Sequence, residues 1–163
     1  VQLAFMVVDE RKRKLAEVDF LVKPLGFEVP EDATKVHGIT HEQALNEGVP
    51  IADVLQVFQS FLAIRPLTLV AHNLPFDGNV LAAESKRAGM KLDFKNDLQT
   101  ADTMKLAQNH FKLRTRPTLT QTYKRLFNRT FDGAHNALVD VKACCDVLFA
   151  LKQQTEIAQS TLY

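Results

Sequence analysis

The first thirty residues of the chain predict a β-hairpin followed by an irregular connection. Residues 1–8 are rich in β-branched and aromatic side chains, which favour strands. The charged run 9–14 is too polar to be buried and predicts the turn, so that 15–22 returns as the second strand. The stretch 24–30 contains two prolines and a glycine, which interrupt regular structure and predict a loop.

Capping residues and apolar spacing predict two consecutive helices after this loop. Thr40 and Gln43 have the form of a capping box, and Gly48 and Pro50 end the short helix that it begins. The next helix carries a single apolar stripe at helical spacing, which indicates packing against a core and no further chemistry. The stripe consists of Ile51, Val54, Leu55, Phe58, Phe61 and Leu62.

A polar cluster follows the next apolar run. Residues 67–71 predict a buried central strand, and the segment 72–77 lies directly beyond its carboxyl end. Residues 76–88 predict a helix, so Asp77 falls in the first turn, where the helix dipole favours a carboxylate. Because open α/β sheets place their sites beyond the carboxyl ends of strands, this cluster is a candidate site. The simpler interpretation of Asp77 is an acid that stabilises a helix start.

The second half of the chain continues the alternation of strands and helices. A weak strand is predicted at 98–101, a helix at 102–109, a helix capped by Thr118, and a long helix at 135–153. Asp140 lies among the apolar positions of that last helix, five residues after His135. The alternation predicts the α/β class.

Composition fits a single soluble domain. The 163 residues are 46% hydrophobic and 24% charged, and the formal net charge is +1, so any affinity for nucleic acid must be local. The only cysteines, Cys144 and Cys145, are adjacent and poorly placed to bridge each other, which indicates a reducing compartment and predicts a cytoplasmic protein. No apolar run is long enough to span a membrane.

Three segments in order carry a recognisable pattern: VHGIT at 36–40, HNLPFD at 72–77 and HNALVD at 135–140. A fourth, DTMKLA at 102–107, lies between the last two. Together they resemble the DEDDh family of 3′–5′ exonucleases, the DnaQ-like group that includes polymerase proofreading subunits. The resemblance covers nearly the whole chain and implies an RNase H-like fold, a mixed sheet flanked by helices in three layers.

The resemblance also implies a site and its chemistry. Asp140 would bind a metal directly, Asp77 would bind partly through water, and His135 would be the general base in hydrolysis with two Mg²⁺ or Mn²⁺ ions. The substrate would be the 3′ end of single-stranded DNA or RNA, and a polymerase or another replication or repair protein would be the partner. The residues expected to contact substrate are His37, His72, Asn73 and Phe76.

One family motif is absent from these residues. The family's first strand ends in Asp-x-Glu, which supplies two of its four carboxylates, and no such motif occurs here at the corresponding place. We therefore expect 1–163 to be a single exonuclease-like domain that is incomplete at its N-terminus, lacks its first strand and is impaired as an enzyme. The alternative is a catalytically inactive domain that binds nucleic acid or a protein partner.

Overall fold

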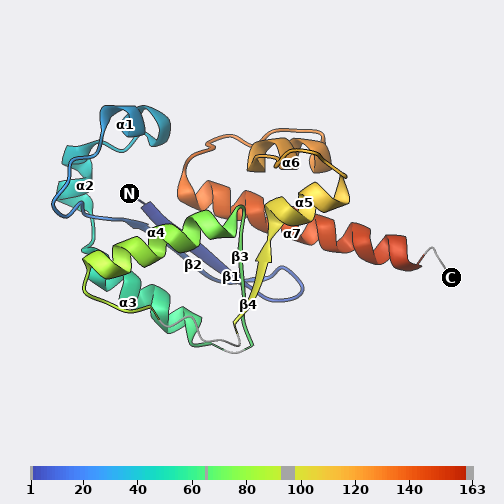
Figure 1. Ribbon diagram of the computed structural model, residues 1–163, viewed down its shortest axis with the longest axis horizontal. Coiled ribbons are helices and arrows are strands. Elements are labelled where there is room, and N and C mark those ends of the chain that lie inside the picture. Colours follow the sequence, from blue (N-terminus) through green and yellow to red (C-terminus); the bar gives the residue numbers. More distant parts are fainter. Residues whose placement is uncertain (1, 65, 93–97, 161–163) are drawn as a thin grey trace.

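The computed structural model describes residues 2–64, 66–92 and 98–160 (Figure 1). The chain begins with the predicted hairpin, in which β1 (Gln2–Val8) pairs antiparallel with β2 (Lys14–Leu21). Asp9 closes the turn, because its Oδ1 accepts the backbone N–H groups of Arg11 (2.9 Å) and Arg13 (2.8 Å). The charged run between the strands is therefore an ordered turn at the surface.

Three helices follow the hairpin: α1 (Glu31–His37), α2 (His41–Glu47) and α3 (Ile51–Leu62). The pattern did not predict α1. It has acidic residues in its first turn and ends at Gly38, whose left-handed backbone (φ 76°) returns its N–H to Thr34 O. The start of α2 is as predicted, since the Thr40 side chain accepts the Gln43 N–H (3.0 Å).

The next two strands form a parallel pair. Strand β3 (Thr68–Ala71) leads into α4 (Leu74–Arg87), and β4 (Gln99–Asp102) leads into α5 (Thr103–His110). Helix α4 begins two residues earlier than predicted, because Asn73 turns the chain through a left-handed conformation (φ 75°) and Pro75 fits the first turn. Parallel strands place their carboxyl ends at one edge, so both helices start there.

The chain ends with α6 (Leu119–Phe127) and α7 (Ala137–Ser160). Both halves of the capping box between Thr118 and Gln121 are formed at the start of α6. The prediction that α7 starts at His135 is wrong by two residues, because His135 has a left-handed backbone (φ 76°) that cannot be part of a helix. Helix α7 also continues past residue 153, to Ser160.

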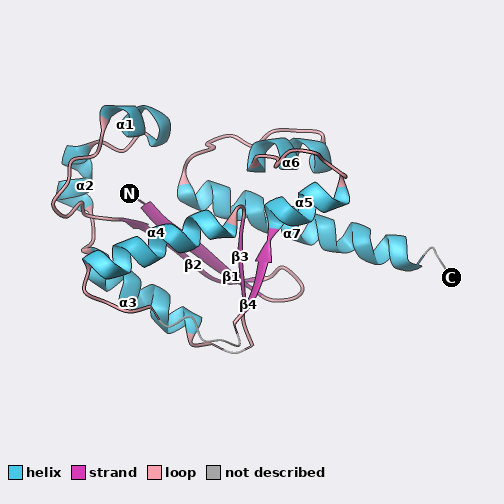
Figure 2. Ribbon diagram, in the orientation of Figure 1, coloured by secondary structure: helices cyan, strands magenta, loops and turns pink. Residues whose placement is uncertain are grey.

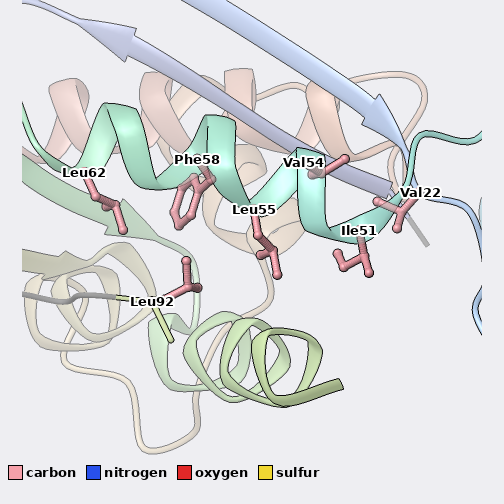
Figure 3. Packing of buried hydrophobic residues seen from close by; sticks show 7 residues of the cluster. All are labelled: Val22, Ile51, Val54, Leu55, Phe58, Leu62 and Leu92. Carbon is pink, nitrogen blue, oxygen red and sulfur yellow. The ribbon is translucent and has the colours of Figure 1, made fainter. Parts of the chain in front are cut away.

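Two apolar cores hold these elements together. The first surrounds α3, with α4 and the strands packed on it (Figure 3), and the second joins α5, α6 and α7. The buried residues of the first are Val22, Ile51, Val54, Leu55, Phe58, Leu62 and Leu92. Those of the second are Ala107, Tyr123, Ala143, Val147 and Leu151. Most of the predicted stripe of α3 is thus core.

The strands lie between these two groups of helices (Figure 2). Leu3 and Phe5 of β1 pack against the α3 core, so the alternate residues, including Gln2, face α7. Among the described residues the hydrogen bonds form two separate pairs, β1 with β2 and β3 with β4, where one mixed sheet was expected. Leu69 of β3 packs on the same α3 core, so both pairs share one face.

No helix in the described ranges is both long enough and apolar enough to cross a membrane.

Candidate active site

The start of α4 is held by a carboxylate at the end of β4. Oδ1 of Asp102 accepts the N–H of Asn73 (3.0 Å) and that of Met104 (3.0 Å). One side chain therefore caps α5 and fixes the left-handed turn into α4. Its other oxygen, Oδ2, is buried without a hydrogen-bond partner among the described residues. Asp77, in the first turn of α4, is placed by this arrangement.

His72 joins the same corner to the loop before α6. Its Nε2 lies 3.0 Å from the carbonyl oxygen of Pro117, and its Nδ1 lies 3.0 Å from Thr103 Oγ1. A carbonyl only accepts, so Nε2 carries a proton and donates to Pro117 O. The Thr103 hydroxyl beside Nδ1 donates to the carbonyl oxygen of Ala71 (3.3 Å). Burial lowers the pKa of His72, an effect that the bond to Pro117 opposes. The ring is thus held on both sides by polar groups of the protein.

Helix α7 meets this corner at Cys144. Its sulfur lies 3.4 Å from Thr103 Oγ1, and burial raises the pKa of the thiol to about 11, with the charges of Asp77 and Asp102 adding to the effect. Cys144 therefore stays protonated and unreactive at neutral pH.

The start of α7 carries the second candidate carboxylate. His135 lies in the turn before the helix, and its backbone N–H donates to Asp140 Oδ2 (3.3 Å). Burial raises the pKa of Asp140, while the hydrogen bond and the charge of His135 lower it. The His135 residue itself is exposed. The predicted base and the predicted ligand are thus neighbours, with the imidazole accessible from solvent.

The two candidate carboxylates lie at the starts of α4 and α7. Asp140 lies one helical turn before Cys144, so both project from the same face of α7. Burial also raises the pKa of Asp77; its own backbone N–H lowers it and the Asp102 carboxylate raises it further. Asp77 thus lies just beyond the carboxyl end of β3, and Asp140 lies on the face of α7 that carries Cys144.

The other residues predicted to contact substrate lie in different settings. Phe76 is 64% exposed on the first turn of α4. The backbone N–H of Asn73 donates to Asp102, and the ring of His72 contacts Thr103 within the protein. His37 ends α1, where its Nδ1 accepts the Ile39 N–H (3.1 Å) and partial burial lowers its pKa. Phe76 is the most accessible of the four for a ligand.

Two candidate metal ligands are present. Among the described residues no group of three or more His, Cys, Asp or Glu side chains could hold an ion. Asp77 and Asp140 nevertheless offer hard carboxylate oxygens, and burial raises the pKa of both. These donors fit one part of the oxygen shell that a divalent cation such as Mg²⁺ requires.

The fold and the motif order agree with a known family. The model of the exonuclease family RNase_T matches residues 1–148. The chain belongs to this exonuclease family. The resemblance to DEDDh exonucleases is therefore confirmed at the level of the family.

The match to a curated relative includes most of this chain but only about half of the relative. The DNA polymerase III subunit epsilon of Pasteurella multocida (strain Pm70) is 28% identical over 124 residues, which are 76% of this chain and 47% of that protein. The chain thus spans about half the length of this curated relative.

Solved structures confirm the fold. Exonuclease I of E. coli in complex with a dT13 oligonucleotide matches with a TM-score of 0.82 and 18% identity over 99% of this chain and 39% of that one. A zinc-bound complex of the same enzyme with single-stranded DNA matches with a TM-score of 0.79 and 19% identity, over 94% of this chain and 36% of that one. The chain has the RNase H-like fold that the sequence predicted.

Proposed function

We propose that the protein removes nucleotides from the 3′ end of single-stranded DNA or RNA by hydrolysis that depends on Mg²⁺ or Mn²⁺. The observation that carries this proposal is the position of Asp77 at the start of α4, beyond β3, together with that of Asp140 beside the exposed His135 at the start of α7. Membership of the exonuclease family and the oligonucleotide bound to exonuclease I support it. The sugar selected by the protein is an outcome of the test below.

Each residue has a distinct part in this reaction. Asp140 would bind a metal directly and Asp77 would bind partly through water, each as a carboxylate oxygen donor. When bound, a pair of divalent cations activates the attacking water and stabilises the leaving 3′ oxygen. His135 takes a proton from that water, a step for which imidazole is suited near neutral pH. Phe76 offers an exposed ring on which a base can stack.

The complete site needs further carboxylates. Two divalent cations carry four positive charges, against two negative charges from Asp77 and Asp140. The edges of β1 and β3 that do not pair with β2 or β4 are without a strand partner in the described residues. We propose that a strand outside these 163 residues pairs there and brings the missing Asp and Glu, so that 1–163 is one exonuclease domain that lacks this strand.

The proposed setting follows from the relatives. The match to a polymerase subunit favours a polymerase, or another replication or repair protein, as the partner. His37, His72 and Asn73 complete the set that we propose to line or support the substrate site around Phe76. A cytoplasmic location agrees with this setting.

Digestion of oligonucleotides labelled at the 5′ end tests the proposal. The full-length protein should give a descending ladder in Mg²⁺ or Mn²⁺ and no products in EDTA, and parallel DNA and RNA substrates show which sugar it accepts. Internal cuts without a ladder, or cleavage that persists in EDTA, would contradict it. Binding of the oligonucleotide without shortening in any metal would instead establish the inactive alternative.

A further inference from the structure

The first turn of α7 is attached to the sheet by one side chain from β1. Oε1 of Gln2 accepts the N–H of Ala137 (3.0 Å), and Nε2 of Gln2 donates to Asp19 Oδ1 on β2 (2.7 Å). Gln2 and Ala137 are 135 residues apart in the chain. This amide therefore ties the first turn of α7 to β1, while one turn further along the helix Lys142 pairs with Glu17 of β2 (3.2 Å).

The orientation of this amide follows from its partners. A carboxylate accepts hydrogen bonds and cannot donate them, so the NH₂ group of Gln2 must face Asp19. The carbonyl oxygen of the amide then points to the N–H of Ala137, from which it accepts. Asp19 thereby fixes the direction in which Gln2 bonds, and the interaction has one polarity from β2 through β1 to α7.

Gln2 also completes the hydrogen bonding of the α7 start. The N–H groups of Leu138 and Val139 donate to Asn136 Oδ1 (3.1 and 3.2 Å), and that of Asp140 donates to Asn136 O (2.9 Å). These local caps do not accept the N–H of Ala137, which donates to Gln2 instead. The sheet thus supplies an acceptor for a first-turn N–H that Asn136 does not bind.

We propose that Gln2, oriented by Asp19, is a positioning residue that fixes the turn bearing His135 and Asp140 relative to the sheet. This role rests on the proposed function, because it matters for catalysis only if those two residues act there. His135 lies two residues before the anchored N–H and Asp140 three residues after it. A shift of this turn by about 1 Å is enough to cost as much as 100-fold in rate.

Reversal of the hydrogen-bond polarity gives a sharp test. In Gln2→Glu the side chain can still accept from Ala137 but meets Asp19 as a second carboxylate. In Gln2→Glu combined with Asp19→Asn, the new amide donates to the new carboxylate, and the link is rebuilt with its roles exchanged and its charge unchanged. Gln43→Glu is the matched control, since Gln43 Nε2 also donates to a carboxylate, that of Glu47 (3.2 Å).

Two readouts in the full-length protein follow each variant. In Gln2→Glu we expect kcat for 3′ digestion to fall about 10- to 100-fold with little change in KM, and the Ala137 amide to exchange faster with solvent by NMR. The double variant should restore both to within a few-fold of wild type, and Gln43→Glu should change neither. General loss of stability would speed exchange throughout the protein and would not be repaired by the swap.

Each remaining result overturns the proposal. Wild-type kcat and Ala137 exchange in Gln2→Glu would show that the link positions nothing. If Gln2→Glu does not fold, the double variant decides: a double variant that folds but has a low kcat would also show that the link positions nothing. If the wild-type protein digests no substrate, the proposed function fails, while Ala137 exchange in the variants still tests the anchor by itself.

Discussion

The two helix starts that present the candidate carboxylates are held in different ways. At α4, a partly buried, charged residue, Asp102, binds the backbone of Asn73 and also caps α5. At α7, neutral side-chain amides accept the first-turn N–H groups: Asn136 binds that of Leu138 from the turn itself, and Gln2 binds that of Ala137 from the sheet. The first start is part of the fold's own packing, whereas the second is an exposed turn attached to it.

Because the two helix starts are held differently, we expect substitutions at them to affect stability and turnover to different extents. Asp102 and its neighbour Thr103 contact β3, α5 and α7 at once, so a change there should disturb the whole corner. The α7 turn leaves His135 exposed, so changes there can alter chemistry while the fold survives. We therefore expect the largest effects on turnover at α7 and the largest effects on stability at α4.

Removal of the imidazole should have the largest effect. In His135→Ala we expect turnover to fall by roughly 100- to 10,000-fold, the usual cost of losing a general base, with metal affinity retained. Single-turnover digestion and calorimetry with Mn²⁺ measure the two quantities. His110→Ala, at another exposed histidine, is the control and should be near wild type. A His135→Ala enzyme of normal rate would remove His135 from the mechanism.

Removal of the α4 anchor should cost stability. Asp102→Ala leaves the N–H groups of Asn73 and Met104 without their acceptor, and we expect a loss of about 2–3 kcal/mol in the free energy of unfolding. Urea denaturation in EDTA measures it. Asp32→Ala, whose side chain is 95% exposed, should change stability by less than about 0.5 kcal/mol. Equal effects of the two variants would contradict the anchoring role of Asp102.

Loss of the local cap of α7 should cost less. Asn136→Ala removes the acceptor of two first-turn N–H groups, and we expect about 1 kcal/mol of destabilisation, as for other N-caps. The same denaturation experiment measures this. A loss as large as that of Asp102→Ala would show that the two helix starts are equally built into the fold.

The pH dependence of stability should show the half-buried His72, with the smallest effect of the four. Burial lowers its pKa in the folded state, so the unfolded chain binds the proton more readily. The contribution of His72 is complete above about pH 6.5 and is lost as pH falls through the lowered folded value. His72→Gln should flatten the fall of melting temperature below about pH 6.5. An unchanged slope would place the acid sensitivity elsewhere.

The sequence predicted much of this molecule because the strongest patterns are local. The hairpin, the apolar stripe of α3 and the capping box at Thr118 depend on near neighbours, and the structure confirms them. The motif order likewise indicated the family. The start of α7 was misplaced because a left-handed backbone at His135 leaves no clear signal in a residue that is not glycine.

The contacts that hold the site could not be predicted. The sequence predicted Asp102 only as an acid at a helix start, and nothing in it indicated that this side chain also binds the backbone of Asn73. The link from Gln2 to Ala137 joins opposite ends of the chain and depends on how β1 and α7 pack. Such interactions are set by tertiary packing, which spacing along a chain does not encode.

The proposed function depends most on Asp140, at the α7 start, as a metal ligand. Calorimetric titration of Mn²⁺ into the full-length protein and its Asp140→Asn variant tests this directly, with Asp32→Asn as the control. We expect Asp140→Asn to bind Mn²⁺ at least about tenfold more weakly, because a charged oxygen donor is replaced by a neutral amide. Equal affinities in wild type and Asp140→Asn would contradict it.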